Sequence, residues 1–463
     1  MEDNKVNITD DKKYINVYGA GLAGCEAAWQ ASRLGVKVRL YEMKPIKYTP
    51  AHHSPVFSEL VCSNSLRSDC ITNAVGLLKE ELSQLGSLIM EAAHATRVPA
   101  GSALAVDREK FSAYITEKIK SDENIEIISR EMTSVESEEI TVIATGPLTS
   151  DGMANYIEKD LGCSGLHFFD AAAPIVDFST IDMGTAFFAS RYGKGDADYI
   201  NCPMTKEQYD AFYEALVSAE EAALKEFDKE EQKNITVFEG CMPVEVMARR
   251  GYDTLRFGPL KPVGLNNPVT GEEYYAVVQL RRENAEGSMY NIVGFQTHLT
   301  FPEQRRVFRM IPGLENAEFM RYGVMHRNTY LDSPKLLTDT YALRSNENVF
   351  FAGQMTGVEG YVESAGSGFV AGINAARRAL GRERYVFSAQ TMLGAMASYV
   401  SVGSVSGKFT PMNANFGIIE PLDYRVKGGK QAKYAVYAER SLSEINTVKE
   451  SIFGEKNGTA TEE

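Results

Sequence analysis

Residues 14–44, YINVYGAGLAGCEAAWQASRLGVKVRLYEMK, carry the pattern that decides the fold of this chain. The apolar alternation of residues 14–18 predicts a strand, which leads directly into the G-x-G-x-x-G pattern of residues 19–24. Small residues then recur at helical spacing, so the helix that they predict can lie close against a sheet. Gly35 suits the left-handed end of that helix. Residues 36–42 alternate again and predict a second strand.

This order of elements is typical of a dinucleotide-binding site. Gly19 permits the sharp turn, Gly21 lets the backbone approach a pyrophosphate, and Gly24 allows close packing between helix and strand. The N-terminus of the helix offers N–H groups and a positive dipole end to the phosphates. Glu42 follows Gly24 by 18 residues, near the spacing at which an acid accepts the ribose hydroxyls. The cofactor-binding residues predicted in this stretch are Gly19, Ala20, Gly21, Leu22, Ala23, Gly24 and Glu42. The stretch is compatible with FAD and with NAD, and a glycine-rich structural turn is the alternative.

Length and composition bound the class of protein. The 463 residues are enough for two or three domains, and 44% hydrophobic with 24% charged residues is typical of a globular protein. No apolar run reaches the length of a membrane span, and the six cysteines show no disulfide-like spacing. We therefore expect a cytoplasmic protein without membrane association, with a flexible leader at residues 1–13. The net charge of −14 argues against broad nucleic-acid binding but leaves room for a local basic patch.

The segments that follow continue an α/β arrangement. Residues 45–73 read as a long loop of the kind that reaches over a bound cofactor. Leucines at helical spacing predict a helix over residues 78–89, and Asp107 is the expected cap of the next helix. Residues 139–146 read as a strand that ends in an Ala-Thr-Gly turn. Gly146 of that turn is a candidate cofactor contact, although such a turn alone is common.

The pattern of predicted elements is different between residues 184 and 332. Thr205 and Gln208 form a capping box that predicts a long, charged helix through Phe227. Strand-like segments follow, and then a helix that begins at Pro302. We interpret residues 184–332 as a second, α+β domain inserted into the first.

A dinucleotide-type pattern returns at residue 348 and continues to Gly381 as an apolar strand, a glycine-rich turn and a helix of small residues. The cofactor contacts predicted in the turn are Gly353, Gly357 and Gly360. The predicted fold class is therefore α/β, a Rossmann-like FAD-binding domain of the glutathione-reductase type with an insertion. We expect this discontinuous domain at residues 14–183 and 333–440, followed by a C-terminal tail at residues 441–463.

Seven segments together resemble the folate- and FAD-dependent tRNA (uracil-5-)methyltransferases, the TrmFO family. They are INVYGAGLAGCEAAWQ (15–30), FSELVCSNSLRSD (57–69), TNAVGLLKEEL (72–82), FEGCMPVEVMARRG (238–251), RYGVMHRNTY (321–330), FFAGQMTGVEGYVESAGSGFVAGINAAR (350–377) and FTPMNANFG (409–417). The resemblance extends over residues 14–440, and these segments are far more specific than a G-x-G-x-x-G pattern.

The resemblance implies a cytoplasmic enzyme that methylates C5 of a uridine in RNA, usually position 54 of the tRNA T-loop. It implies 5,10-methylenetetrahydrofolate as the carbon donor, FAD as the cofactor and NADH or NADPH as the reductant. The partners are then tRNA and small molecules, with no obligate protein partner and no metal. The two glycine-rich segments would hold FAD at opposite ends.

Two cysteines match the functional cysteines of the family. C5 of uracil becomes nucleophilic when a soft nucleophile such as a thiolate adds to C6. By resemblance, Cys241 of the EGCMP segment is the candidate for that addition, and Cys62 of the SELVCSN loop is the candidate for removing the C5 proton. The division of roles stays open at this point. The plainer interpretation of either residue is a buried, inert thiol, as we interpret the other four cysteines.

Histidines and basic clusters give weaker signals. His298 lies in the segment GFQTHL (294–299), which is also family-like, and is the candidate for stacking on the folate pterin, with a structural histidine as the alternative. Three basic clusters are candidate contacts for RNA phosphates, each with a solvated surface as the alternative: Arg281-Arg282, Arg305-Arg306-Arg309 and residues 427–440.

Three other functions fit parts of the pattern. The same chemistry on a ribosomal RNA uridine would use the same motifs. A GidA-like flavoprotein that modifies the tRNA wobble uridine would share the FAD-binding ends, although the CMPVE segment fits it poorly. A non-catalytic flavin-binding RNA chaperone would be expected to lack Cys62 or Cys241, and both are present.

Overall fold

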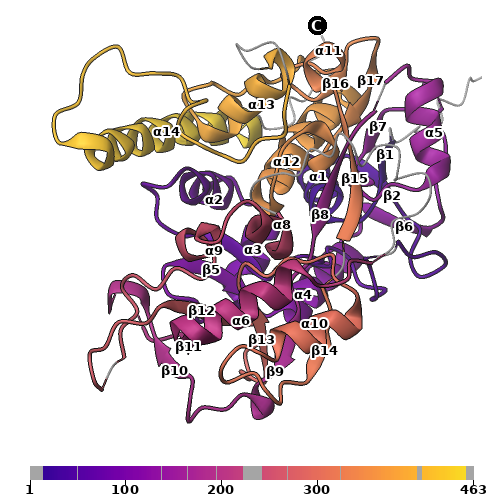
Figure 1. The fold of residues 1–463 in the computed structure, drawn as a ribbon. Helices are drawn as coiled ribbons and strands as arrows, with labels where there is room; N and C mark the ends of the chain where they lie inside the picture. Colours follow the sequence, from indigo (N-terminus) through magenta and orange to yellow (C-terminus); the bar gives the residue numbers. More distant parts are fainter. Residues whose placement is uncertain are drawn as a thin grey trace, which may run out of the picture.

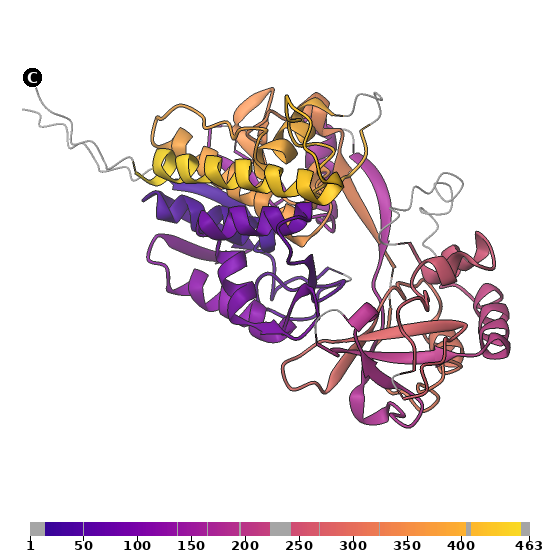
Figure 2. The same cartoon turned by 90° about the vertical axis from the view of Figure 1, so that its left-hand side faces the viewer.

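The computed structural model describes residues 14–49, 51–136, 138–163, 165–193, 196–222, 242–267, 269–323, 325–403 and 409–454. These residues form two lobes, each built around its own sheet (Figures 1 and 2). The expected leader, residues 1–13, lies outside the described residues.

The larger lobe is built around a mostly parallel sheet. Its strand order is β16-β17-β7-β1-β2-β6, and β16 is the antiparallel edge strand. The strands are β1 (Tyr14–Tyr18), β2 (Lys37–Glu42), β6 (Ile125–Ser129), β7 (Thr141–Ile143), β16 (Ala342–Leu343) and β17 (Asn346–Phe351). Because β1 pairs with β2 on one side and with β7 on the other, the strand order reverses at β1, where doubly wound folds bind ligands. The predicted Rossmann-like fold class is confirmed.

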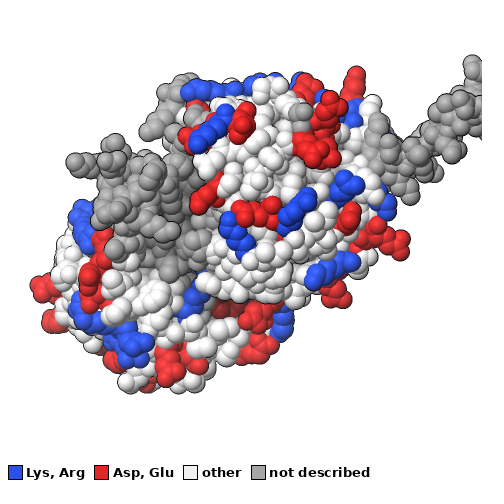
Figure 3. All heavy atoms as spheres, turned by 90° about the vertical axis from the view of Figure 1, so that its right-hand side faces the viewer, with Lys and Arg blue, Asp and Glu red and all other residues white. Residues whose placement is uncertain are grey.

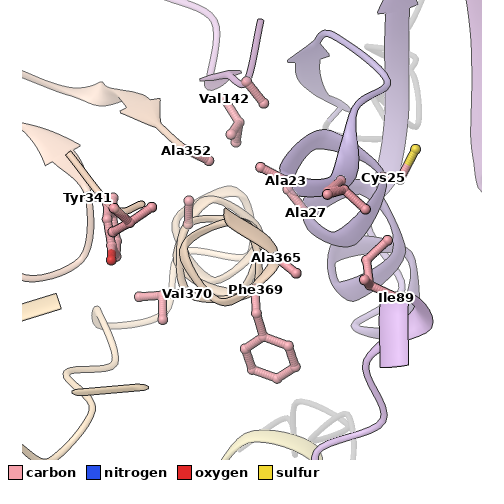
Figure 4. Packing of buried hydrophobic residues seen from close by; sticks show 14 of the residues in the cluster. Ala23, Cys25, Ala27, Ile89, Val142, Tyr341, Ala352, Ala365, Phe369 and Val370 are labelled. Atoms are coloured by element: carbon pink, nitrogen blue, oxygen red, sulfur yellow. The ribbon is translucent and has the colours of Figure 1, made fainter. Parts of the chain in front are cut away.

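Two helices of small residues pack together beside this sheet. α1 (Leu22–Arg33) follows the first glycine pattern and α12 (Tyr361–Ala379) follows the second. A Cβ on Gly372 would lie 2.5 Å from the carbonyl oxygen of Ala27, so only glycine permits this approach. Figure 4 shows Ala23 and Ala27 turned toward α12. The close packing brings the N-termini of both helices to the same edge of the sheet.

Further helices cover the larger lobe. They are α2 (Ala74–Gln84), α3 (Leu88–Ala95), α4 (Arg108–Ser121), α5 (Asp151–Lys159), α11 (Ser333–Leu336), α13 (Met392–Val402) and α14 (Gly429–Phe453). A small sheet of β3 (Ser65–Ser68), β5 (Ala103–Val106) and β4 (Arg97–Val98) lies within this lobe. Asp107 caps α4 as expected, through a bond from the Lys110 amide. The single helix expected over residues 78–89 is wrong, because Gly86 adopts φ +79° and Ser87 caps a separate helix.

The smaller lobe holds an antiparallel sheet in the order β10-β11-β12-β13-β9-β14. Its strands are β9 (Ile175–Asp177), β10 (Phe187–Ala189), β11 (Tyr199–Met204), β12 (Ala276–Arg282), β13 (Met289–Ile292) and β14 (Phe319–Arg321). Its helices are α6 (Lys206–Val217), α8 (Val244–Arg249), α9 (Thr254–Phe257) and α10 (Phe301–Phe308). The capping box of Thr205 and Gln208 is confirmed. The helix that it starts ends at Val217 rather than Phe227, and residues 223–241 lie outside the described residues.

A two-stranded ribbon joins the lobes. β8 (Gly165–Ala171) pairs antiparallel with β15 (Met325–Leu331), and Figure 2 shows the pair running from one lobe to the other. We propose that the two lobes are the two domains of the chain. The second sheet already begins at β9, before the boundary expected at residue 184. The expected boundary is too late because this short strand does not change the composition of the sequence. Residues 441–453 are not a separate tail, since they continue α14, which buries Ile445, Val448 and Ile452 against the larger lobe.

Candidate functional site

A cavity opens at the carboxyl ends of the parallel strands, where the strand order reverses. It holds about 1140 Å³ of empty space, part of which is open to solvent. Its wall includes most of the residues that the glycine patterns predicted: Gly19, Ala20, Gly21, Leu22, Ala23, Glu42, Gly146 and Gly353. Segments that are far apart in the sequence therefore meet around one space, large enough for a dinucleotide.

The glycines of the first turn divide into two kinds. A Cβ on Gly21 would meet nothing within 4 Å, and Gly21 has an ordinary φ of −79°. Its missing side chain therefore leaves open the space that a pyrophosphate would fill, at the uncapped N-terminus of α1. A Cβ on Gly24 would lie 1.8 Å from the carbonyl oxygen of Gly19, so Gly24 serves the packing of helix against turn and does not line the cavity.

Glu42 is held rigidly at the end of β2. One carboxylate oxygen accepts the Ala20 amide at 2.9 Å, and the other accepts the Lys44 amide at the same distance. The side chain is 7% exposed and borders the cavity. Each carboxylate oxygen has a further acceptor position, so Glu42 fits the binding of ribose hydroxyls.

The second glycine turn forms the opposite wall through other residues than expected. Gly353 borders the cavity, whereas Gly357 and Gly360 do not. Gly357 packs under Phe409, and Gly360 is the N-cap of α12 at φ +127°. Tyr361 and Ser364, at the start of α12, complete this wall of the cavity. Neither was predicted from the sequence.

The loop that carries Cys62 is fastened to Tyr361. The hydroxyl of Tyr361 accepts the backbone amides of Cys62 at 2.9 Å and of Ser63 at 3.2 Å. Glu59 and Val61 of the same loop line the cavity. Burial raises the pKa of Tyr361, with the charge of Cys62 adding to this effect, so the phenol stays protonated near neutral pH. Cys62 is not itself a lining residue, but it follows Val61, which is, on a loop that the half-buried Tyr361 holds.

The smaller lobe holds this loop from its other side. The guanidinium of Arg281 donates to Asn64 at 3.1 Å and to Ser63 at 2.7 Å, and Arg281 is only 8% exposed. Arg108 donates to the Leu60 carbonyl and pairs with Glu283 at 2.8 Å. The expected role of Arg281 as a phosphate contact is corrected, because its side chain is buried and its Nε and Nη2 donate to the Cys62 loop. This contact across the lobes has no signal in the local sequence.

The structure does not bring His298 to the cavity wall. The backbone amide of His298 donates to Glu245 at 2.7 Å, and the Thr297 hydroxyl donates to the same carboxylate at 2.9 Å. Glu245 lies in α8, four residues after Cys241, and Cys241 itself lies outside the described residues. Burial lowers the pKa of His298, which favours a neutral ring at pH 7. Its Nε2 is buried and has no hydrogen-bond partner within the described residues.

The remaining cysteines, metal binding and membrane crossing can also be assessed for the described residues. Burial raises the pKa of Cys25 to about 12 and that of Cys163 to about 11, so these thiols are inert near neutral pH. Cys202 is buried as well, whereas Cys70 is exposed. Within the described ranges, no group of three or more His, Cys, Asp or Glu side chains is placed to hold a metal ion. No helix among them is both long and apolar enough to cross a membrane.

Comparison with known proteins places the chain in a family. The family model described as Glucose inhibited division protein A matches residues 14–383. Curated proteins named methylenetetrahydrofolate--tRNA-(uracil-5-)-methyltransferase TrmFO match nearly full length. That of Acetivibrio thermocellus is 60% identical, with 95% of this chain and 98% of that protein covered. That of Bacillus pumilus is 55% identical, with 95% and 100% covered.

Solved structures agree on the fold. Two crystal forms of Aquifex aeolicus GidA superpose with a TM-score of 0.68 at 18% identity. They cover 96% of this chain and 75% or 78% of the GidA chain. The predicted resemblance is thereby confirmed over nearly the whole sequence, and the chain belongs to the TrmFO family of methylenetetrahydrofolate--tRNA-(uracil-5-)-methyltransferases.

Proposed function

We propose that this protein methylates C5 of a uridine in tRNA, with 5,10-methylenetetrahydrofolate as the carbon donor and FAD as the cofactor. Relatives that are 55–60% identical are named for this reaction, which supports the proposal. The structural observation that carries the proposal is the glycine-walled cavity with the Cys62 loop at its border.

The residues of the cavity fit FAD. Gly21 and the N-terminus of α1 would receive the pyrophosphate, Glu42 the adenosine ribose, and Gly353 with Tyr361 the opposite end. Bound FAD supplies the two electrons, taken from NADH or NADPH, that convert the transferred methylene carbon into a methyl group. Tyr361 and Arg281 hold the loop of Cys62 beside that site and position its thiol.

The two cysteines divide the work on the uracil ring. The Cys241 thiolate adds to C6, which makes C5 nucleophilic toward the methylene carbon. Transfer of that carbon to C5 breaks its bonds to the two folate nitrogens and releases tetrahydrofolate. Cys62 then removes the C5 proton, and loss of that proton allows the Cys241 bond to C6 to break. The position of the Cys62 loop, whose Glu59 and Val61 line the cavity, supports the proposed role of Cys62, whereas the role of Cys241 rests on the family resemblance.

Trapping with 5-fluorouridine tRNA tests these roles, because fluorine at C5 prevents the proton loss that releases the enzyme. Cys241→Ala should abolish both the adduct and methylation while FAD stays bound. Cys62→Ala should lower the rate of methylation by several orders of magnitude. The variant should still form the adduct. Near-parental methylation by Cys241→Ala would sink the nucleophile assignment, and an adduct that depends on Cys62 alone would reverse the roles.

We propose His298 as a folate contact. The buried Nε2, which has no hydrogen-bond partner among the described residues, and the lowered pKa are consistent with a neutral ring that faces a bound molecule. His298 lies beside the first turn of α8, the helix that follows Cys241 closely in the chain. It does not lie in the wall of the FAD cavity. His298→Ala should raise the concentration of methylenetetrahydrofolate needed for half-maximal rate and leave tRNA affinity unchanged. Equal folate dependence in both proteins would remove His298 from the site.

The target within RNA is proposed as uridine 54 of the T-loop. We further propose that the enzyme acts without an obligate protein partner and in the cytoplasm, a location that the lack of disulfide-like cysteine spacing favours. The purified protein alone should therefore methylate an unmodified tRNA transcript when given methylenetetrahydrofolate and NADPH. Nucleoside analysis with mapping of the modified position checks this. Methylation of ribosomal RNA but not of tRNA would favour the ribosomal alternative, and wobble modification would favour the GidA-like one.

A further inference from the structure

Three aromatic rings form a stack on the surface of the smaller lobe. The rings of Phe301 and Tyr322 lie 4.6 Å apart at an interplanar angle of 16°, and those of Tyr322 and Phe319 lie 5.4 Å apart at 13°. Phe301, at one end of the stack, is 50% exposed at the start of α10. An exposed phenyl ring at the end of an ordered stack is a surface on which a further flat ring can lie.

Arginines surround this stack. Arg305 donates to the Tyr322 hydroxyl at 2.6 and 3.1 Å, and Arg309 donates to the Ala317 carbonyl at 2.8 and 3.0 Å. Among the described residues, no carboxylate lies within ion-pair distance of either side chain, whereas Arg306 pairs with Glu303 at 2.6 Å. The positive charge of Arg305 and Arg309 is therefore available to a ligand, on a protein whose net charge is −14.

The same residues line a hollow in the surface. Its wall consists of Phe301, Pro302, Arg305, Arg306, Arg309 and Tyr322. Figure 3 shows acidic and basic side chains interspersed over the face that it draws, so a long-range field of one sign does not distinguish that face. What distinguishes the hollow is a flat aromatic surface beside two arginines, Arg305 and Arg309, that have no carboxylate partner among the described residues. This combination is typical of surfaces that bind single-stranded nucleic acid.

One residue connects the hollow with the catalytic region. Arg321 precedes Tyr322 in the chain and ends β14, where its Nη2 is buried without a partner among the described residues. Burial lowers the pKa of Arg321, and the ionisable groups that lie near enough to influence that pKa are Arg108, Tyr361, Glu59 and Glu283. Glu59 and Tyr361 line the FAD cavity. Because Arg321 and Tyr322 are consecutive residues, about 3.8 Å apart at their Cα atoms, the backbone that carries the aromatic stack runs next to the groups around Arg321.

We propose that the stack of Phe301, Tyr322 and Phe319, with Arg305 and Arg309, is a binding ledge for an unpaired nucleotide of the RNA substrate next to the target uridine. A base stacks on the exposed face of Phe301, and the flanking phosphates bind the two arginines. This inference rests on the proposed function, because it names the surface that the tRNA substrate uses. Unpaired nucleotides are required, since a base inside a duplex does not expose its face.

Binding of an unmodified tRNA transcript to the FAD-bound protein tests the ledge. Phe301→Ala should weaken binding at least fivefold, because stacking on an aromatic side chain is lost. Phe301→Trp should bind at least as tightly as the parent. Arg305→Gln should weaken binding and reduce the slope of log affinity against log salt by about one. FAD content and NADPH oxidation without RNA should stay unchanged in all three variants, which shows that they fold.

Phe188→Ala is the matched control, because it removes another partly exposed phenyl ring of the same lobe, 39% exposed and near Phe178. It should bind tRNA like the parent. Affinity of Phe301→Ala within twofold of the parent, or an equal loss in Phe188→Ala, would overturn the ledge. Neither outcome touches the proposed function, which fails only if the parent protein does not methylate tRNA.

Discussion

At the scale of single residues, Gly21 offers the sharpest test of the cofactor site. Its φ is −79°, and a Cβ there would point into open space, so a larger side chain is compatible with the folded backbone. Gly21→Val should therefore yield a folded protein that lacks FAD, because the side chain occupies the place of the pyrophosphate. The absorbance of bound flavin measures this, and circular dichroism checks the fold. A full flavin spectrum in the variant would show that the site is misplaced.

The residues of the site differ in how far the sequence could predict them. Gly21 and Glu42 lie in one strand–turn–helix–strand unit, where spacing along the chain fixes spacing in space. Tyr361 meets Cys62 across 299 residues and Arg281 meets Ser63 across 218, so no local pattern announces either contact. Arg281 looked like a surface cation because its sequence neighbours are charged, and only the packing of the two lobes buries it.

At the scale of elements, the close contact between α1 and α12 positions the starts of both helices at the cofactor cavity. A Cβ on Gly372 would lie 2.5 Å from a backbone oxygen of α1, which cannot move without shifting the helix. Gly372→Ala should cost about 1–3 kcal/mol of stability and lower FAD affinity, because both helices begin at the cavity. Thermal unfolding and flavin retention measure the two effects.

Gly366→Ala is the control for this prediction. It lies in the same helix, and its Cβ would meet only the ends of leucine side chains, Leu393 at 3.1 Å, Leu78 at 3.7 Å and Leu82 at 4.0 Å. It should be neutral or slightly stabilising, since alanine favours helix more than glycine does by about 1 kcal/mol. If both variants lose FAD equally, the close approach of α1 and α12 does not explain the effect.

The junction of α2, α13 and α14 should make stability depend on pH. Burial raises the pKa of Glu81 from 4.5 to about 7, although the Glu81 carboxylate also accepts the amides of Met392 and Leu393 and the hydroxyl of Ser441. Between these two pKa values the folded protein binds more protons than the unfolded chain. The free energy of unfolding should therefore fall as pH rises from 5 to 7, by up to about 1.4 kcal/mol per pH unit from this group.

Glu81→Gln removes the titrating group and isolates its contribution. The variant should be less stable throughout, because an amide cannot accept all three hydrogen bonds, but its stability should fall less steeply with pH than that of the parent. Unfolding midpoints in urea at several pH values measure the difference in slope. Parallel pH profiles of parent and variant would contradict the raised pKa.

Secondary structure was predictable where caps and periodicity agree, as at Asp107 and the Thr205 capping box. It was not where a single glycine decides. Leu78, Leu82, Leu85 and Ile89 keep helical spacing through Gly86, so periodicity alone cannot show that the chain turns there. The second half of α14 was missed for a different reason, because its apolar side chains complete a core formed by distant segments.

At the scale of the whole molecule, the two lobes meet at the Cys62 loop. Arg281 and the Arg108–Glu283 pair bring the smaller lobe against the segment that borders the cofactor cavity. The arrangement explains how residues from both halves of the sequence serve one reaction. The sequence predicted the two parts and the family, but not the contact between them, because that contact is made by side chains far apart along the chain.

The transfer of the folate carbon to tRNA is the central claim, and one measurement tests it most directly. The purified protein is incubated with an unmodified tRNA transcript, NADPH and 5,10-methylenetetrahydrofolate labelled with carbon-13 in its methylene group. We predict 5-methyluridine at position 54 with the label in its methyl group, detected by mass spectrometry, and none with the Gly21→Val protein. Absence of 5-methyluridine, or an unlabelled methyl group that requires S-adenosylmethionine, would contradict the account.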